Sequence, residues 1–80
     1  MKRPKPSLTE NKMLILYAFS RLGGLTNSQT LRFFIENDLI DYIDIQLSLA
    51  ELLSGKLLFT EQEPLGATYY LTELGFDAVE

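Results

Sequence analysis

The chain has 80 residues and a formal net charge of −4, and 46% of its residues are hydrophobic. A chain of this length forms one small domain and buries only about 60% of its unfolded surface. It contains no cysteine and no histidine, which excludes disulfides, thiol and imidazole catalysis, and the usual zinc sites. The remaining carboxylates are scattered without a glycine-rich phosphate loop, so we expect no enzymatic activity, no cofactor and no metal.

Charge is distributed unevenly along the chain. Residues 1–12 have a net charge of +3, whereas residues 13–80 have a net charge of −7. The opening MKRPKPS contains two prolines and no periodicity, which predicts a flexible basic arm over residues 1–7 and one domain over residues 8–80. No apolar run approaches the roughly 18 residues that span a membrane, and no signal-type apolar segment follows the arm. We therefore expect a cytoplasmic protein that does not contact a membrane.

Two helices are predicted in the first half of the domain. The first runs over residues 10–22, with Thr9 as its cap, and stops at the glycine pair 23–24. A short strand, residues 25–26, precedes the capping-box pattern Thr26-x-x-Gln29, which opens a second helix over residues 28–37. Helical spacing predicts two core faces, formed by Ile15, Phe19 and Leu22 in the first helix and by Leu31, Phe34 and Ile35 in the second.

The third predicted helix lies in DYIDIQLSLAELLSG, with Asp41 as its cap and Gly55 at its end. Its spacing of 100° per residue separates three groups of side chains. One apolar face should enter the core, a second apolar face lies on another side, and a polar wedge lies between them. The core face consists of Ile45, Leu49 and Leu52, the second apolar face of Ile43, Leu47 and Ala50, and the polar wedge of Asp44, Ser48 and Glu51.

The last third of the chain predicts a hairpin and a final helix. KLLFTE and TYYLT have strand composition, QEPLGA between them contains turn residues, and Thr72 caps ELGFDAVE. The order is helix, short strand, helix, helix, hairpin, helix. It predicts an α+β winged helix-turn-helix with a three-helix core, a two-stranded wing and a C-terminal helix. The alternative is a three-helix bundle with an added hairpin, but the strand composition favours the wing.

Several segments resemble winged-helix proteins. Leu49-x-x-Leu52 followed by Leu57-Leu58 resembles the LxxLxxxGLI end of recognition helices in winged-helix transcriptional regulators, although the glycine comes one place early here and Lys56 occupies its usual position. The stretch YYLTELG, residues 69–75, resembles the YxLTxxG passage from the second wing strand to the final helix. LTENKMLILYAF and LTNSQTLRFFIENDLIDY resemble a bacterial family of winged-helix domains of unknown function.

The resemblance implies a transcriptional regulator that forms a homodimer through its terminal helices and has a longer C-terminal half in many relatives. Carried over by position, the residues facing DNA would be Asp44, Gln46, Leu47 and Ser48. Duplex DNA binding requires several phosphate neutralisations. The third helix supplies no basic residue, and the wing adds Glu61 and Glu63. DNA binding by this domain is therefore expected to be weak or absent.

Two functional hypotheses remain. In the first, a regulator-type domain contacts duplex DNA, and the candidate residues are Lys2, Arg3, Lys5, Gln46 and Ser48. In the second, the fold is kept as a protein-interaction or dimerisation module that does not bind DNA. Its candidate contacts are Met13, Tyr17, Phe33, Ile43, Leu47 and Phe76. The alternatives are ordinary ones: a solvated arm, aromatic residues within the core, and Ile43 and Leu47 packed beneath the wing or against the first helix.

Overall fold

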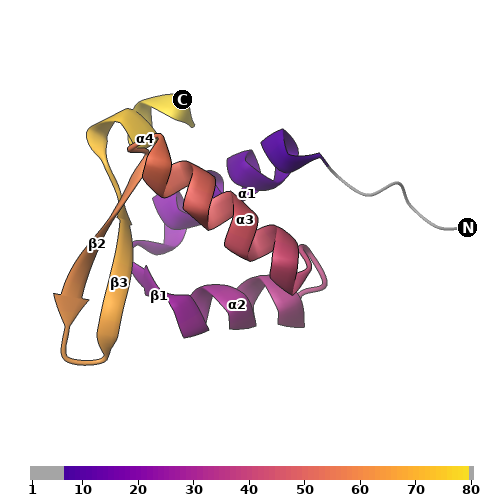
Figure 1. Ribbon diagram of the computed structural model, residues 1–80, viewed down its shortest axis with the longest axis horizontal. Helices are drawn as coiled ribbons and strands as arrows, with labels where there is room; N and C mark the ends of the chain where they lie inside the picture. Colours follow the sequence, from indigo (N-terminus) through magenta and orange to yellow (C-terminus); the bar gives the residue numbers. More distant parts are fainter. Residues whose placement is uncertain (1–6, 80) are drawn as a thin grey trace, which may run out of the picture.

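A computed structural model describes residues 7–79 of the chain. These residues form helices α1 (Leu8–Leu22), α2 (Asn27–Glu36), α3 (Tyr42–Ser54) and α4 (Glu73–Ala78), and strands β1 (Leu25–Thr26), β2 (Leu58–Glu63) and β3 (Gly66–Leu71). In Figure 1 the three longer helices pack together, the β2–β3 hairpin projects at one side, and α4 lies at the base of the hairpin. The predicted α+β class and the order of the elements are confirmed.

The three strands form one antiparallel sheet in the order β1-β3-β2. Leu25 pairs with Tyr69, and Leu58 pairs with Leu71, so the two-residue strand β1 closes one edge of the hairpin. Successive side chains of a strand point to opposite faces of the sheet. Leu58 and Leu71 are therefore buried on the inner face, while Tyr70 lies on the outer face. This strand order is compatible with a winged-helix-like fold.

Helix α1 begins two residues earlier than the sequence pattern predicts. Its cap is Ser7 and not Thr9: the Ser7 hydroxyl accepts a hydrogen bond from the Glu10 backbone N–H, and the Ser7 N–H donates to Glu10 Oε1. This reciprocal capping box satisfies two backbone donors that a helix start leaves free. The flexible arm was predicted over residues 1–7. Residues 1–6 lie outside the described residues, and Ser7 is the cap of α1.

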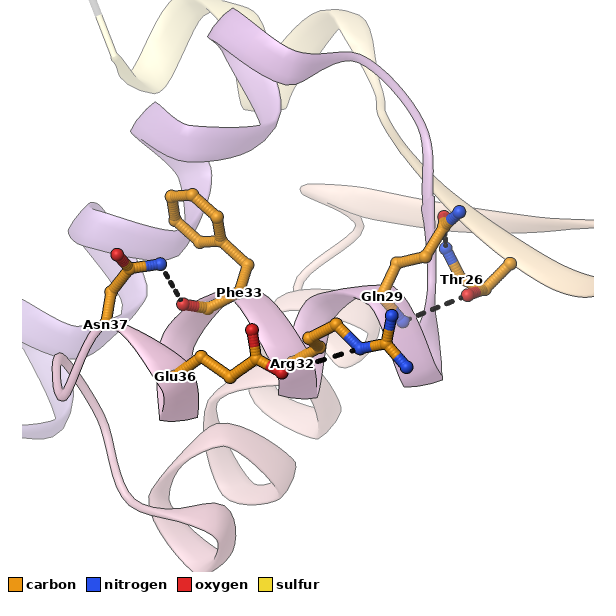
Figure 2. A network of polar contacts seen from close by, with 6 residues as sticks. All are labelled: Thr26, Gln29, Arg32, Phe33, Glu36 and Asn37. Atoms are coloured by element: carbon orange, nitrogen blue, oxygen red, sulfur yellow. Dashed lines mark hydrogen bonds and ion pairs between the residues drawn. The ribbon is translucent and has the colours of Figure 1, made fainter.

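Helix α2 confirms the predicted capping box but turns a different face inward. Thr26 and Gln29 exchange hydrogen bonds at its start, as Figure 2 shows. The fully buried residues are Thr30 and Phe34, whereas Ile35 is 45% exposed. Thr30 can be buried because its hydroxyl donates to the Thr26 carbonyl at 2.8 Å, and a satisfied polar group costs little to bury. The prediction of Ile35 as a core residue was wrong.

The core draws on every long element. Helix α3 contributes Ile45, Leu49 and Leu52, as predicted. Helix α1 contacts α3, α4 and β3, so it buries a broader face than the pattern indicated, and Leu22, at its last turn, is 51% exposed instead of buried. The buried hydrophobic residues are Ile15, Leu16, Ala18, Phe19, Phe34, Ile40, Ile45, Leu49, Leu52, Leu58 and Leu71.

The segment YYLTELG fixes α4 to the connection between α3 and β2. The Thr72 hydroxyl accepts from the Gly75 N–H at 3.0 Å and donates to the Lys56 carbonyl at 2.7 Å. The Thr72 N–H donates to the Leu57 carbonyl at 3.1 Å. A single threonine therefore caps α4 and joins it to the turn that follows α3, which accounts for the spacing of threonine and glycine in this motif.

Candidate interaction surface

Helix α3 presents an apolar outer face to solvent. Ile43 is 69% exposed and Leu47 is 54% exposed, so neither packs beneath the hairpin nor against α1 in the single chain. Tyr42, in the first turn of the same helix, is also exposed. Large apolar side chains grouped on one exposed helix face indicate a contact surface more often than scattered single residues do.

The two polar candidates on α3 do not face solvent in the way the resemblance implies. Ser48 has no exposed surface, so its hydroxyl cannot reach a base edge. It lies on the core side, next to Ile45 and Leu49 in the helical projection. Within the described residues, the Ser48 hydroxyl has no hydrogen-bond partner. In this structure Ser48 is therefore not exposed for the DNA contact that the resemblance implies.

Gln46 is half-buried and belongs to a polar network that joins three elements. Its Nε2 donates to Asn27 Oδ1 over a long 3.5 Å, and Asn27 Nδ2 donates to the Tyr69 hydroxyl at 3.0 Å. The network runs from α3 through the start of α2 to β3. Its bond between Asn27 and Tyr69 joins residues that are 42 positions apart in the chain. It fixes the Gln46 amide against α2 at the edge of the exposed face.

The described cations are largely engaged by neighbours. Lys12 forms an ion pair with Glu51 on α3 at 3.7 Å. Arg32 pairs with Glu36 along α2 at 3.6 Å, and Figure 2 draws this second pair. The Arg21 guanidinium lies 5.5 Å from the centre of the Tyr17 ring and donates to its hydroxyl. Glu51, one of the polar-wedge residues of α3, thus has a cationic partner. These cations are less available for phosphate contacts.

The other candidate contact residues lie on three different helices, α1, α2 and α4. Met13 and Tyr17 are exposed on α1, and Phe76 is exposed on α4. Phe33 differs from them because it is half-buried and packs against the core, with its ring edge-on to Phe34 at 5.0 Å. The structure therefore brings Ile43 and Leu47 together on α3 but not with Phe33. Lys2, Arg3 and Lys5 lie outside the described residues.

The sequence pattern missed a hollow on the outer face of the hairpin. Two adjoining depressions, of about 410 and 280 Å³, share Thr26, Gln29 and Leu65 in their walls. We call the larger one the hairpin groove; it lies between the hairpin turn, the outer face of the sheet and the first turn of α2. A signal was present in Gly24, because a side chain there would overlap the ring of Tyr70, which lies in the groove.

This architecture defines a small α+β domain of four helices and a three-stranded antiparallel sheet within the described residues. The chain belongs to the family described as Domain of unknown function (DUF4364), whose model matches residues 11–80. No curated protein and no solved structure matches the chain. Within residues 7–79, none of the helices combines the length and the hydropathy needed to cross a bilayer.

Proposed function

We propose that this chain is a winged helix-turn-helix domain of the type found in bacterial transcriptional regulators, and that its α3 surface binds protein in preference to duplex DNA. The order β1-β3-β2 and the placement of α3 after α2 support the fold assignment. The observation that carries the function is the exposure of Ile43 and Leu47 on the outer face of α3, the face that such regulators turn toward the major groove.

Electrostatics supports a protein partner. Helix α3 contains no lysine or arginine, and the hairpin carries Glu61 and Glu63. A surface of this kind does not release counterions from DNA, which is the main source of affinity for a duplex. Burying Ile43 and Leu47 against another apolar surface would instead contribute on the order of 1.5–3 kcal/mol for each fully buried side chain.

The partner that we propose is a second copy of the chain. A domain of 80 residues buries a smaller fraction of its surface on folding than a larger domain does, and association stabilises such domains by mass action. A symmetric contact between two α3 helices would cover the same residues on both copies, as twofold symmetry requires. The domain would then be a homodimerisation module.

Sedimentation equilibrium of the full chain over a wide concentration range tests this proposal. The average mass should rise toward twice the chain mass of 9.1 kDa. The double substitution Ile43→Gln and Leu47→Gln should weaken association at least tenfold. Leu22→Gln is the matched control because Leu22 is similarly exposed, at 51%, but lies on α1. A chain that remains monomeric at several hundred micromolar, or equal effects of both changes, would contradict the proposal.

A second candidate function is duplex DNA binding, favoured by the fixed position of Gln46 and by the basic residues Lys2, Arg3 and Lys5. Fluorescence anisotropy with mixed-sequence duplexes at low salt tests it directly. Micromolar binding that weakens with salt and is lost on changing the three basic residues to glutamine would support this function. Absence of binding at micromolar protein would remove it.

A further inference from the structure

The hairpin groove is lined by one aromatic ring, that of Tyr70, with the Phe59 ring adjoining it outside the groove and Glu63 at the rim. Tyr70 lies against Gly24, which has no side chain to displace it, and the Phe59 ring stacks on Tyr70 with centroids 5.6 Å apart and planes inclined by 27°. Pro64 and Leu65 of the turn form the far wall, and Leu65 is 86% exposed. Such a surface offers flat apolar contacts to an incoming chain.

The charges around this groove have one sign. Glu63 is the only charged residue among those that line the groove within the described part of the chain, and Glu61 lies on the same face of β2 two residues away. The pKa of the Tyr70 hydroxyl is raised above its ordinary value, mainly by desolvation. A hydrogen bond to Glu63 and the charges of Glu63 and Glu61 contribute smaller increases. Both carboxylates therefore act on Tyr70 and not only on bulk solvent.

Aromatic rings with carboxylates beside them suit a segment that combines prolines with lysine or arginine. Proline-rich segments dock on aromatic-lined grooves, and cations are attracted both by aromatic faces and by carboxylates. The chain contains such a segment in KRPKP, residues 2–6, where its positive charge is concentrated. The charges of the groove and of this segment are complementary.

Geometry indicates that this segment must come from another molecule. Helix α1 has 15 residues and is about 22 Å long at 1.5 Å per residue. The chain enters α1 at Ser7, whereas the last turn of α1 leads into Gly24 at the groove; Figure 1 shows α1 running from its indigo start toward the hairpin. Pro4 and Pro6 precede Ser7 by three residues and one residue, so even an extended chain carries them at most about 11 Å from Ser7. This is half the length of α1, so these prolines cannot occupy the groove of their own chain.

We infer that the hairpin groove binds residues 2–6 of a second copy of the chain, with Pro4 and Pro6 against the Tyr70 ring and the adjoining Phe59 ring, and the basic side chains at Glu61 and Glu63. This contact is separate from the α3 surface and does not depend on it. It assigns a function to the acidic hairpin and to the basic segment together. Because charge contributes to it, salt should weaken it.

Intermolecular paramagnetic relaxation enhancement in the full chain tests this contact. The chain contains no cysteine, so Lys2→Cys gives a unique site for a spin label and leaves Arg3, Lys5 and both prolines in place. The labelled copy, without isotope, is mixed with a ¹⁵N-labelled wild-type copy, so that only contacts between molecules are detected. Broadening is expected at the amides of Gly24, Thr68 and Tyr70, at least severalfold above that of α3 amides.

Charge-matched variants of the ¹⁵N-labelled copy identify the contact. Glu61→Gln with Glu63→Gln should remove most of the broadening, whereas Glu73→Gln with Asp77→Gln on α4 changes the net charge equally and should leave it unchanged. Absence of broadening at the groove, broadening concentrated on α3 or α1, or equal effects of the two variant pairs would overturn the inference. This measurement can be interpreted even if sedimentation contradicts the α3 proposal, because the broadening is recorded separately for each amide of the groove.

Discussion

Gly75 lies so close to Leu57 that a side-chain methyl group on Gly75 would overlap the Leu57 carbonyl oxygen. This contact brings the first turn of α4 against the connection between α3 and β2, where Thr72 also bonds to the Lys56 and Leu57 carbonyls. The glycine of the YYLTELG motif is thus required by close backbone approach, and not by an unusual backbone angle.

Gly75→Ala should destabilise the domain, because the new methyl group would force α4 away from Leu57. Overpacking of this kind costs typically about 1–3 kcal/mol. Gly55→Ala is the matched control: Gly55 has φ −82°, and an added methyl there makes only an ordinary contact with Glu51. Urea unfolding should show a clear loss for the first variant and little change for the second. Equal midpoints for the two variants would contradict the proposed overlap.

Lys56 adopts the left-handed conformation, with φ 62°, at the position where the resembling recognition-helix motif has glycine. Gly55, one residue earlier, does not need this freedom. The left-handed conformation costs a non-glycine residue roughly 1–2 kcal/mol. Glycine avoids this strain, but it loses more conformational entropy on folding, which offsets part of the gain. Lys56→Gly should therefore raise the free energy of unfolding by up to about 1 kcal/mol, measured by urea titration. Lys56→Ala, which keeps the strain and removes the charge, should not stabilise the domain.

Sequence patterns were sufficient where local chemistry decides the structure. The capping box of Thr26 and Gln29, the core face Ile45, Leu49 and Leu52, and the hairpin were all predicted from short-range spacing and composition. These features depend on helix caps, helical periodicity and turn residues, which act within a few positions of one another.

The patterns failed where tertiary contacts set which face is buried. Thr30 replaces Ile35 in the core because a backbone carbonyl satisfies its hydroxyl, and the sequence does not reveal that bond. Ser48 was placed on a polar wedge, but helix packing leaves it fully buried. The hairpin groove is formed by two segments distant in the chain, residues 24–29 and 63–70, so no local pattern could predict it.

Ser48→Ala should stabilise the domain. The buried Ser48 hydroxyl has no partner among the described residues, and an unsatisfied buried polar group costs about 1–3 kcal/mol. Alanine removes the hydroxyl at little cost in packing and has a better helix propensity. Ser54→Ala, at an exposed position of the same helix, measures the propensity contribution alone. Thermal unfolding should show a larger gain for Ser48→Ala; a loss of stability would indicate that the hydroxyl is bonded in solution.

The bond between Asn27 and Tyr69 should couple the start of α2 to β3. A double-mutant cycle with Asn27→Ala and Tyr69→Phe should give a coupling free energy of about 0.5–1.5 kcal/mol, typical of one internal hydrogen bond. Tyr70→Phe in place of Tyr69→Phe is the control, because Tyr70 lies on the opposite face of the sheet. Additive effects of Asn27→Ala and Tyr69→Phe would show that the network contributes nothing measurable.

The capping box of α1 should make stability depend on pH. Hydrogen bonds from the Ser7 backbone and then its side chain lower the pKa of Glu10 below its ordinary value of 4.5. A carboxyl group whose folded pKa is lowered stabilises the fold at pH values above its unfolded pKa, and this contribution is lost as the pH falls through the folded pKa. Glu10→Gln keeps the capping geometry without a titrating group. Between pH 6 and pH 3, the melting temperature of the wild type should therefore fall further than that of Glu10→Gln. Parallel curves would show that the Glu10 carboxylate is not held by Ser7 in solution.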